Sequence, residues 1–251
     1  MIHAERLSKM RAVVTGGATG IGEAIARLFA QHGANVLTVD LPESQILQKY
    51  DGINGITGAV CDVSEDGAPD LTLSLAEEHL GGLDILVNNA GIAGLAPVEH
   101  SSDDAWDTIM AVNLRPVFRL SRAFLPMLKK SPAGRIINLG SIFSSFGAPG
   151  MAAYSASKHA IAGLTKSMAN EVGKHGITVN FIQPGAIMTD MTRDNFRANP
   201  DIRDEWIRKA AVGRLGEPLD VARVALFLAS DDAAFVSGTG VVVDGGAVNA
   251  L

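Results

Sequence analysis

The chain has 251 residues, of which 47% are hydrophobic and 19% charged, so it can bury a substantial core and lacks the composition of a disordered sequence. Its formal net charge of −6, without a cluster of lysine and arginine, argues against a nucleic-acid-binding surface. The single cysteine, Cys61, excludes an internal disulfide and any zinc site built on cysteines.

Residues 1–6 lack the apolar core of a signal peptide, and no apolar run is long enough to span a bilayer. We therefore expect a soluble, cytoplasmic protein with neither a membrane nor a nucleic acid as partner. The histidines show no spacing typical of metal ligands, so no metal site is predicted.

Apolar runs typical of strands alternate with helical stretches along the chain. The predicted strands are 10–15, 35–40, 58–62, 84–88, 134–140, 177–183 and 240–244. The predicted helices are 21–32, 68–80, 103–129, 152–175 and 219–229. Continuously apolar strands are typical of a parallel sheet covered on both faces. The alternation predicts an α/β fold: a Rossmann-like, doubly wound parallel sheet of about seven strands flanked by helices.

No linker, low-complexity tract or repeat divides the sequence, so residues 1–251 are expected to form a single domain. The longest stretch without a clear element runs from Pro184 to Pro218. Its charged and aromatic residues favour short helices over disorder. Because long insertions of this kind are often lids or binding loops, we expect a substrate-loop insertion at about 186–217.

The first predicted strand leads into a glycine-rich turn that opens the first helix. Such a turn exposes unpaired N–H groups at the positive end of the helix dipole, where a pyrophosphate can bind. Its spacing, Gly-x-x-x-Gly-x-Gly, departs from the commoner Gly-x-Gly-x-x-Gly, but its place between a strand and a helix still predicts a dinucleotide site. The residues assigned to the cofactor here are Gly16, Thr19, Gly20, Ile21 and Gly22.

Asp40 ends the second predicted strand. Its carboxylate can accept hydrogen bonds from the ribose hydroxyls of NAD, and it would repel the 2′-phosphate of NADP. Thr19 supplies no compensating cation. We therefore predict NAD as the cofactor; the alternative is that Asp40 only begins a turn.

Two further motifs follow strands at the same edge of the sheet. Asp62 and Val63 come after the third strand and could place a carboxylate near the adenine amino group. Asn89, Ala90 and Gly91 come after the fourth, where open α/β sheets bind ligands. Asparagine also leaves strands through turn chemistry, and both interpretations can hold together.

Tyr154 and Lys158 stand four residues apart in a predicted helix, with Ser141 upstream of them. An i, i+4 pair lies on one helix face, so the ammonium is close to the phenol. A nearby cation lowers a tyrosine pKa, ordinarily about 10, by roughly 1–3 units, which suits it to proton transfer. Such a pair also occurs by chance on solvated helices, so it indicates a catalytic site only together with the other motifs.

Together these motifs, in this order, resemble the short-chain dehydrogenase/reductase family over nearly the whole chain. The resemblance implies one Rossmann-type domain for dinucleotide binding and catalysis, a nicotinamide cofactor, and oxidation or reduction at a carbinol or carbonyl carbon. It also implies that Pro184, Gly185, Ile187 and Thr189 form the wall beside the nicotinamide.

Four residues match the family's catalytic positions. The resemblance implies that Tyr154 is the general base in alcohol oxidation and the general acid in carbonyl reduction. It implies that Lys158 binds the nicotinamide ribose and, with the oxidised nicotinamide, lowers the Tyr154 pKa. Ser141 would hold the substrate oxygen, and Asn113 would bend a helix and position a water leading from Lys158 to solvent. The alternatives are that Ser141 is a turn serine and Asn113 an ordinary polar residue in a helix.

The expected substrate pocket is mostly apolar and carries no evident fixed cation. The candidates are Ile92, Leu95, Phe143, Met151, Ile187, Met191 and Phe196, of which Phe143, Met151, Ile187 and Met191 are assigned to the pocket. We therefore expect a neutral secondary alcohol or ketone as the small-molecule substrate. Whether Phe143 faces the pocket stays open.

The sequence thus predicts an NAD-dependent oxidoreductase that interconverts a secondary alcohol and a ketone. The alternative is an NADPH-dependent 3-oxoacyl-[acyl-carrier-protein] reductase, against which Asp40 and Thr19 count. A protein that binds NAD without turnover is disfavoured because Tyr154 and Lys158 are both present. Small residues on the helix 152–175 allow close approach of a second subunit, and the family is commonly tetrameric or dimeric, so a homotetramer is expected.

Overall fold

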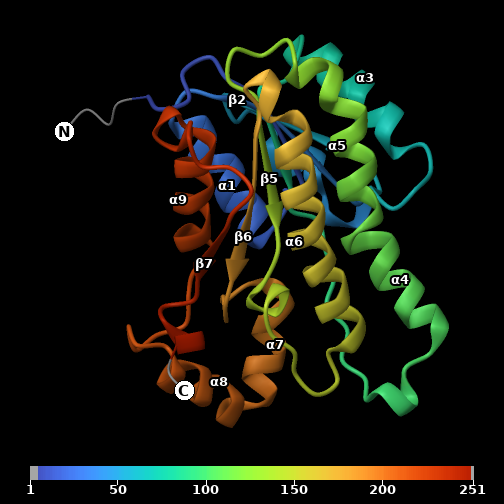
Figure 1. Ribbon diagram of the computed structural model, residues 1–251, viewed down its shortest axis with the longest axis vertical. Coiled ribbons are helices and arrows are strands. Elements are labelled where there is room, and N and C mark those ends of the chain that lie inside the picture. Colours follow the sequence, from blue (N-terminus) through green and yellow to red (C-terminus); the bar gives the residue numbers. More distant parts are fainter. Residues whose placement is uncertain (1–4, 250–251) are drawn as a thin grey trace.

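The computed structural model describes residues 5–249; residues 1–4, part of the segment in which we looked for a signal peptide, lie outside the described residues. Its strands are β1 (Arg11–Thr15), β2 (Asn35–Asp40), β3 (Ile56–Val60), β4 (Ile85–Asn88), β5 (Arg135–Leu139), β6 (Thr178–Pro184) and β7 (Gly240–Val243). All pair in parallel, in the order β3-β2-β1-β4-β5-β6-β7 (Figure 1). The predicted doubly wound α/β fold is confirmed.

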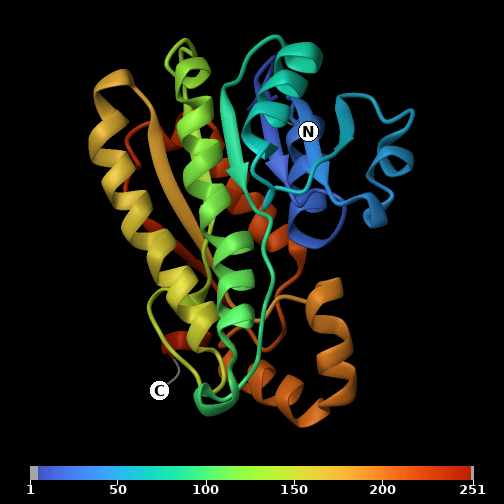
Figure 2. The ribbon, with the colours of Figure 1, turned by 90° about the vertical axis from the view of Figure 1, so that its right-hand side faces the viewer.

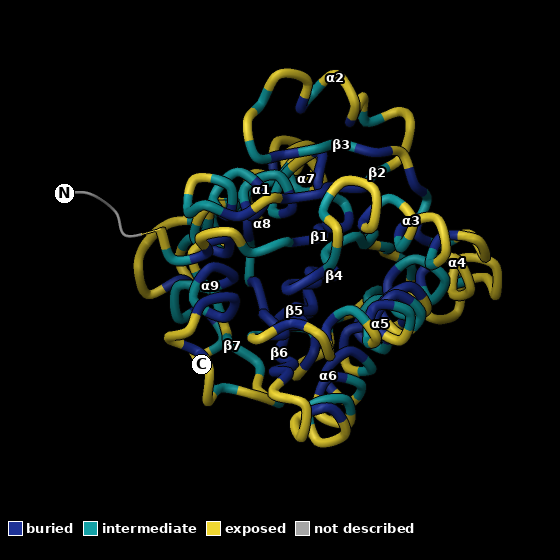
Figure 3. The backbone as a smooth tube through the Cα atoms, turned by 90° about the horizontal axis from the view of Figure 1, so that it is seen from above, coloured by how far each residue is buried: buried dark blue, intermediate teal, exposed yellow. Residues whose placement is uncertain are grey.

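Helices cover both faces of the sheet. They are α1 (Gly20–Gln31), α2 (Ile46–Tyr50), α3 (Ala68–Leu80), α4 (Asp103–Asn113), α5 (Arg115–Leu128), α6 (Ala152–Val172), α7 (Asp190–Ala198), α8 (Pro200–Lys209) and α9 (Pro218–Ala229). In Figures 1 and 3, α1 and α9 lie on one face, and α3, α5 and α6 lie on the other. The chain order reverses direction between β1 and β4, and this switch point is where open α/β sheets bind their ligands.

The apolar strand runs are explained by burial on two sides. Ile85, Leu86 and Val87 of β4 are all fully buried. Ile85 and Val87 join the hydrophobic cluster that holds residues of α1 and α9, whereas Leu86 joins the cluster on the opposite face. Alternate side chains of one strand therefore enter two different cores, which is why the strand is not amphipathic.

Two predicted elements differ from the structure, and one short helix was not predicted. The single helix expected over 103–129 is two helices, because Pro116 has no backbone N–H to continue the first one, and Leu114 between them has a φ of −119°, away from the helical value of about −63°. The strand expected at 58–62 is shifted to 56–60, since the Asp62 carboxylate accepts hydrogen bonds from the Ser64 N–H and hydroxyl and begins a turn. Helix α2 has only five residues, too few for a periodic pattern, and the sequence did not predict it.

The stretch between Pro184 and Pro218 contains two short helices, as predicted. Figure 2 shows α7 and α8 projecting beyond the carboxyl ends of the strands, apart from the helices that cover the sheet. Across residues 5–249, no helix is both long and apolar enough to cross a membrane.

Candidate active site

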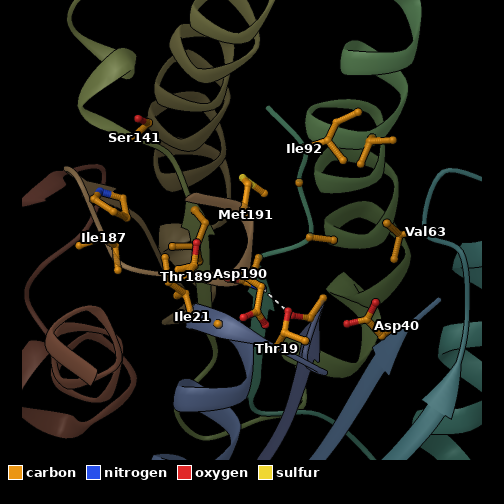
Figure 4. Close-up of a pocket in the computed structure, with 18 of the residues that line it drawn as sticks. Thr19, Ile21, Asp40, Val63, Ile92, Ser141, Ile187, Thr189, Asp190 and Met191 are labelled. Atoms are coloured by element: carbon orange, nitrogen blue, oxygen red, sulfur yellow. Dashed lines mark hydrogen bonds between the residues drawn. The ribbon is translucent and has the colours of Figure 1, made fainter. Parts of the chain in front are cut away.

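A cavity of about 380 Å³ lies at the carboxyl edge of the sheet. It brings together most of the residues that the sequence assigned to cofactor, catalysis and substrate. These are Gly16, Thr19, Gly20, Ile21, Asp40, Asp62, Val63, Asn89, Ala90, Gly91, Ser141, Tyr154, Lys158, Pro184, Gly185, Ile187, Thr189 and Met191. Figure 4 shows Thr19 and Asp40 near the ends of the first strands, with Thr189 and Met191 reaching in from the segment around α7.

The glycine-rich loop between β1 and α1 is fixed by its neighbours. Gly16 and Gly20 both have positive φ angles (64° and 55°), which only glycine adopts without strain. The Asn89 side-chain amide donates to the carbonyl oxygens of Thr15 and Gly16, each at 2.9 Å, and so joins the loop to the end of β4. The two interpretations of Asn89, turn chemistry and cavity lining, therefore both apply.

Gly22 does not line the cavity, although the sequence assigned it to the cofactor. A Cβ atom at this position would lie 2.0 Å from the Gly16 carbonyl oxygen and 2.5 Å from the Asn89 amide nitrogen. Gly22 therefore acts indirectly: because it has no side chain, α1 can approach the loop that the cofactor would contact.

We expect Gly22→Ala to distort this loop. The clash involves backbone, so it cannot be relieved by a side-chain rotation; we expect a loss of about 1–3 kcal/mol of stability and a rise of more than about ten-fold in the KM for the dinucleotide. Gly163→Ala is the matched control, because nothing lies within 4 Å of the added Cβ in α6. The control should gain up to about 1 kcal/mol. Equal KM values in the two variants would contradict this account.

Asp40 both begins a turn and lines the cavity. Its Oδ2 accepts a hydrogen bond from the Ala18 N–H at 2.8 Å, and its Oδ1 accepts one from the Leu41 N–H at 2.8 Å. Each carboxylate oxygen keeps a further lone pair. Among the described residues that line the cavity, Asp40, Asp62 and Asp190 are acidic and Lys158 is the only lysine or arginine.

Lys158 is buried, and its Nζ donates a hydrogen bond to the Leu139 carbonyl oxygen at the end of β5, at 2.8 Å. The same nitrogen lies 5.6 Å from the centroid of the Tyr154 ring. Burial lowers the pKa of Lys158 from 10.5 to about 8.

The pKa of Tyr154 is shifted in the direction opposite to the one that we expected from Lys158. Burial raises it above 10.0, and hydrogen bonding with Ser141 only partly opposes the rise. For the residues of the site by themselves, desolvation of the phenolate raises the Tyr154 pKa, and the Lys158 ammonium is itself buried and turned toward Leu139. The lowering that we expect from Lys158 together with the oxidised nicotinamide stays a prediction.

The buried lysine predicts a pH-dependent stability. Below pH 8, Lys158 is charged in both the folded and the unfolded chain. Between about pH 8 and 10.5 it is neutral in the folded chain and still charged in the unfolded chain. The unfolded chain therefore binds more protons in this range, and the folded state becomes more stable as the pH rises. Wild type should therefore gain about 3 kcal/mol relative to Lys158→Met as pH rises through this window. Urea unfolding of both proteins at several pH values measures the difference, in which the titrating groups remote from Lys158 cancel. A constant difference would show that the lysine pKa is ordinary.

Asn113 is buried and does not line the cavity. Its Oδ1 accepts from the Ile92 N–H at 2.8 Å, and its Nδ2 donates to the Ile92 carbonyl at 2.9 Å and to the Ser157 hydroxyl at 3.2 Å. The helix ends directly at Asn113, and these bonds tie that end to α6 and to the segment after β4. The water that we expect it to position stays a prediction.

Ser141 is a turn serine and a cavity residue at once. Its hydroxyl accepts from the Phe143 N–H at 3.2 Å and begins the 3₁₀ helix η3 (Ile142–Ser144). The Phe143 ring meets the Tyr154 ring edge-on, with centroids 6.0 Å apart, and neither Phe143 nor Met151 lines the cavity. The assignment of Phe143 and Met151 to the pocket is therefore not supported, since Phe143 packs against the tyrosine and Met151 stands just before α6.

Several cavity residues were not assigned from the sequence. They are Val39, Leu41, Cys61, Ser64, Val112, Leu139, Gly140, Asp190 and Thr192, whereas Ile92, which also lines the cavity, was a candidate from the sequence. Most flank an assigned residue, so widening each motif by one position would have found them. Within residues 5–249, no group of histidine, cysteine and carboxylate side chains could hold a metal ion.

The donor set fits a dinucleotide. The loop glycines leave backbone close to the cavity, a carboxylate stands at the end of β2, and a lysine and a tyrosine line the same cavity. These features are those that a pyrophosphate, a ribose and a reacting carbinol group require.

Comparisons with known proteins identify the family of the chain. Residues 16–248 match the family described as Enoyl-(Acyl carrier protein) reductase. The chain is 40% identical over 237 residues to the 3-oxoacyl-[acyl-carrier-protein] reductase FabG of Vibrio harveyi, covering 94% of this chain and 96% of the relative. The proteins of the same name from Vibrio cholerae and Escherichia coli are 41% and 40% identical, with the same coverage of both chains.

The chain therefore belongs to the short-chain dehydrogenase/reductase family, as its motifs indicated. It is an oxidoreductase that acts on a CH–OH group with a nicotinamide cofactor, and the particular proteins that it is similar to are 3-oxoacyl-[acyl-carrier-protein] reductases.

Proposed function

We propose that this protein interconverts a secondary alcohol and a ketone by hydride transfer to and from NAD, with Tyr154 as the general acid and base. The observation that carries the proposal is the position of Tyr154 in one cavity with Ser141, Lys158 and the glycine-rich loop. A bound nicotinamide supplies the hydride acceptor in oxidation and the hydride donor in reduction.

The residues of the site hold the substrate, transfer the proton and bind the cofactor ribose. The Ser141 hydroxyl holds the substrate oxygen, and the Tyr154 hydroxyl gives that oxygen a proton in reduction or removes it in oxidation. Lys158 is placed to bind ribose hydroxyls through the N–H bonds that Leu139 does not use. Asn113, held by Ile92 and Ser157, is a positioning residue for α6, the helix that carries both Tyr154 and Lys158.

The preference for NAD over NADP rests on charge. Asp40 stands where the adenosine ribose is expected, and the cavity carries three carboxylates against one lysine among its described residues. A 2′-phosphate would meet a like charge and no arginine, and such a juxtaposition costs several kcal/mol. Asp62 and Val63 are proposed to contact the adenine, and the run from Pro184 to Thr189 the nicotinamide.

Two substrate classes are candidates. The largely apolar wall formed by Ile187 and Met191 suits a neutral secondary alcohol or ketone. The second candidate, a 3-oxoacyl thioester carried by acyl carrier protein, is favoured by the relatives, all three of which carry that activity in their names. If it is the substrate, the protein is a 3-oxoacyl reductase.

Initial rates with purified protein test both candidates. NAD and NADP, and their reduced forms, are compared across secondary alcohols, sugar alcohols, hydroxysteroids and 3-oxoacyl thioesters. Turnover confined to NAD(H) with a free alcohol supports the first candidate. Turnover of the thioester with NADPH would reject both the first candidate and the role of Asp40.

We further propose that residues 1–251 act as one domain with the segment 186–217 as its substrate loop, and that the protein is a cytoplasmic homotetramer. Support for assembly comes from large apolar side chains that remain exposed on α4, α5 and β7: Trp106, Phe118 and Val242. Sedimentation of the 26.2 kDa chain measures the assembly state, and a monomer at all concentrations would contradict the tetramer.

A further inference from the structure

Tyr50 is a buried tyrosine to which neither the catalytic proposal nor the cofactor motifs give a role. It ends the short helix α2 and is 3% exposed. Its hydroxyl donates a hydrogen bond of 2.6 Å to the Gly17 carbonyl oxygen, in the glycine-rich loop. It does not line the cavity, so it cannot be a catalytic residue.

The bond from Tyr50 reaches the same peptide unit that contacts Asp40. The carbonyl of the Gly17–Ala18 peptide accepts from Tyr50 at 2.6 Å, and the N–H of that peptide donates to Asp40 Oδ2 at 2.8 Å. A peptide unit is planar and stiff. Its rotation about the chain would break both bonds together, so the direction of the Asp40 carboxylate is linked to the Tyr50 hydroxyl.

The loop has little room to adjust if this bond is lost. Gly17 is buried, and a Cβ atom on it would lie 2.7 Å from the Thr38 Cβ of β2. The Gly17 N–H, which belongs to the peptide before Gly17, donates to the Val39 carbonyl oxygen at 3.4 Å, and the Gly16 N–H donates to the same oxygen at 2.8 Å. The Gly17–Ala18 peptide is thus fixed by β2 on one side and by Tyr50 on the other.

Tyr50 is itself held rigidly as a neutral donor. The Arg27 guanidinium lies 5.4 Å from its ring centroid, and Glu23 joins Arg27 at 2.9 Å and Lys49 at 2.8 Å, which connects α1 to α2. Burial raises the pKa of Tyr50 well above its ordinary value, with the Glu23 charge adding to the rise. The hydroxyl therefore keeps its proton at every working pH.

The placement of α2 explains how so short a helix reaches the loop. Figure 3 shows α2 at the outer edge of the molecule, beyond the edge strand β3. Gly58 of β3 allows this contact, because a Cβ there would lie 2.4 Å from the Ile46 carbonyl oxygen. Ile46 and Tyr50 are the buried residues of α2, while Leu47 between them is 53% exposed.

We propose that Tyr50 is a positioning residue for cofactor recognition: through the Gly17–Ala18 peptide it holds the Asp40 carboxylate in the direction that selects NAD over NADP. The inference rests on the proposed function, in which Asp40 reads the adenosine ribose. It assigns α2 a role in cofactor selectivity, although no residue of α2 lines the cavity.

Tyr50→Phe tests the inference, since it removes the hydroxyl and keeps the ring. Loss of one such bond should raise the KM and Kd for NAD by about five- to ten-fold, because the loop and Asp40 lose their common restraint. The turnover number at saturating NAD should stay within about two-fold of wild type, and the NAD/NADP ratio of kcat/KM should fall. The Kd is measured by fluorescence titration with NADH, independently of turnover.

Ile46→Val is the matched control. It removes one methyl group from the other buried side chain of α2 and leaves the Tyr50 bond in place. It should lower the melting temperature without changing the KM for NAD or the cofactor ratio. If Tyr50→Phe behaves in the same way as Ile46→Val, Tyr50 is only structural and the inference is overturned.

Asp40→Asn separates this inference from the function on which it depends. If Asp40→Asn leaves the NAD/NADP ratio unchanged, the proposed cofactor assignment fails. If Asp40→Asn lowers the ratio and Tyr50→Phe does not, only the inference fails. In the double variant the two effects should be less than additive, because both act through one peptide.

A donor analogue covers the case in which Tyr50→Phe does not fold. With 4-aminophenylalanine at position 50, the ring remains and a weaker N–H donor replaces the hydroxyl, so the KM for NAD should rise above that of wild type and the NAD/NADP ratio of kcat/KM should fall. A KM and a cofactor ratio equal to those of wild type would overturn the inference.

Discussion

Replacing Tyr154 by phenylalanine is expected to lower the turnover number in both reaction directions by about 10²–10⁴-fold, the usual contribution of a positioned general acid or base. The ring, its edge-on contact with Phe143 and the 5.6 Å distance to Lys158 are kept, so only the hydroxyl is lost. Single-turnover rates with saturating cofactor measure the effect on the chemical step.

The control for this variant is Ser155→Ala, one residue further along α6. Ser155 is buried, and among the described residues its hydroxyl has no hydrogen-bond partner, so its removal should leave the turnover number within about two-fold. Both variants should bind NADH as wild type does, by fluorescence titration. A single-turnover rate of Tyr154→Phe close to that of wild type would contradict the proposed mechanism.

The sheet could be predicted because each strand carries its own signal. The run 85–87 is apolar at every position, and the structure buries these residues in two cores on opposite faces. The motif residues could be placed for a related reason: the carboxyl ends of parallel strands meet at one edge, so residues that follow different strands converge there without further information.

Helix boundaries within 103–129 were less predictable, although Pro116 was visible in the sequence. A proline in the first turn of a helix is favourable, whereas one in the interior is not, and the periodic pattern alone does not distinguish these cases. The break is stabilised by the Asn113 side chain, which bonds to Ile92, a residue 21 positions away in the sequence. That contact exists only in the folded protein.

The chemistry of the catalytic pair was predicted only in part. The spacing of Tyr154 and Lys158 places both on one face of α6, which the structure bears out. The sequence could not show that Leu139 of β5 would accept the Lys158 ammonium bond, or that burial would shift both pKa values toward the neutral forms. The balance between a nearby charge and desolvation is a property of the surroundings, not of the spacing.

For Ser141 and Asp40, a structural role in a turn and a functional role in the site are compatible. Each accepts hydrogen bonds from backbone N–H groups close in the sequence or in a neighbouring loop, and each also lines the cavity. The backbone bonds fix the direction in which the remaining lone pairs point. A side chain held in this way loses little further entropy when a ligand binds.

Asp40→Asn is expected to lower the NAD/NADP ratio of kcat/KM by at least about 10²-fold, because it removes the like charge that a 2′-phosphate would meet. The amide oxygen can still accept one of the two backbone bonds, from Ala18 or Leu41, so the turn should persist with a modest loss of stability. Initial rates with both cofactors, over the full range of each concentration, give the ratio. If the ratio did not change, the carboxylate would serve the turn alone.

A second substitution should shift the cofactor preference further toward NADP. Thr19 is exposed and lines the cavity together with Asp40, so Thr19→Arg in the Asp40→Asn background places a guanidinium where a 2′-phosphate can pair with it. We expect the double variant to prefer NADP, whereas Thr19→Ala in the same background should match Asp40→Asn. Thr19→Arg alone, with Asp40 left intact, should shift the preference toward NADP much less, because the Asp40 carboxylate would pair with the new guanidinium. This order of the four proteins follows only if charge at the end of β2 decides which cofactor binds.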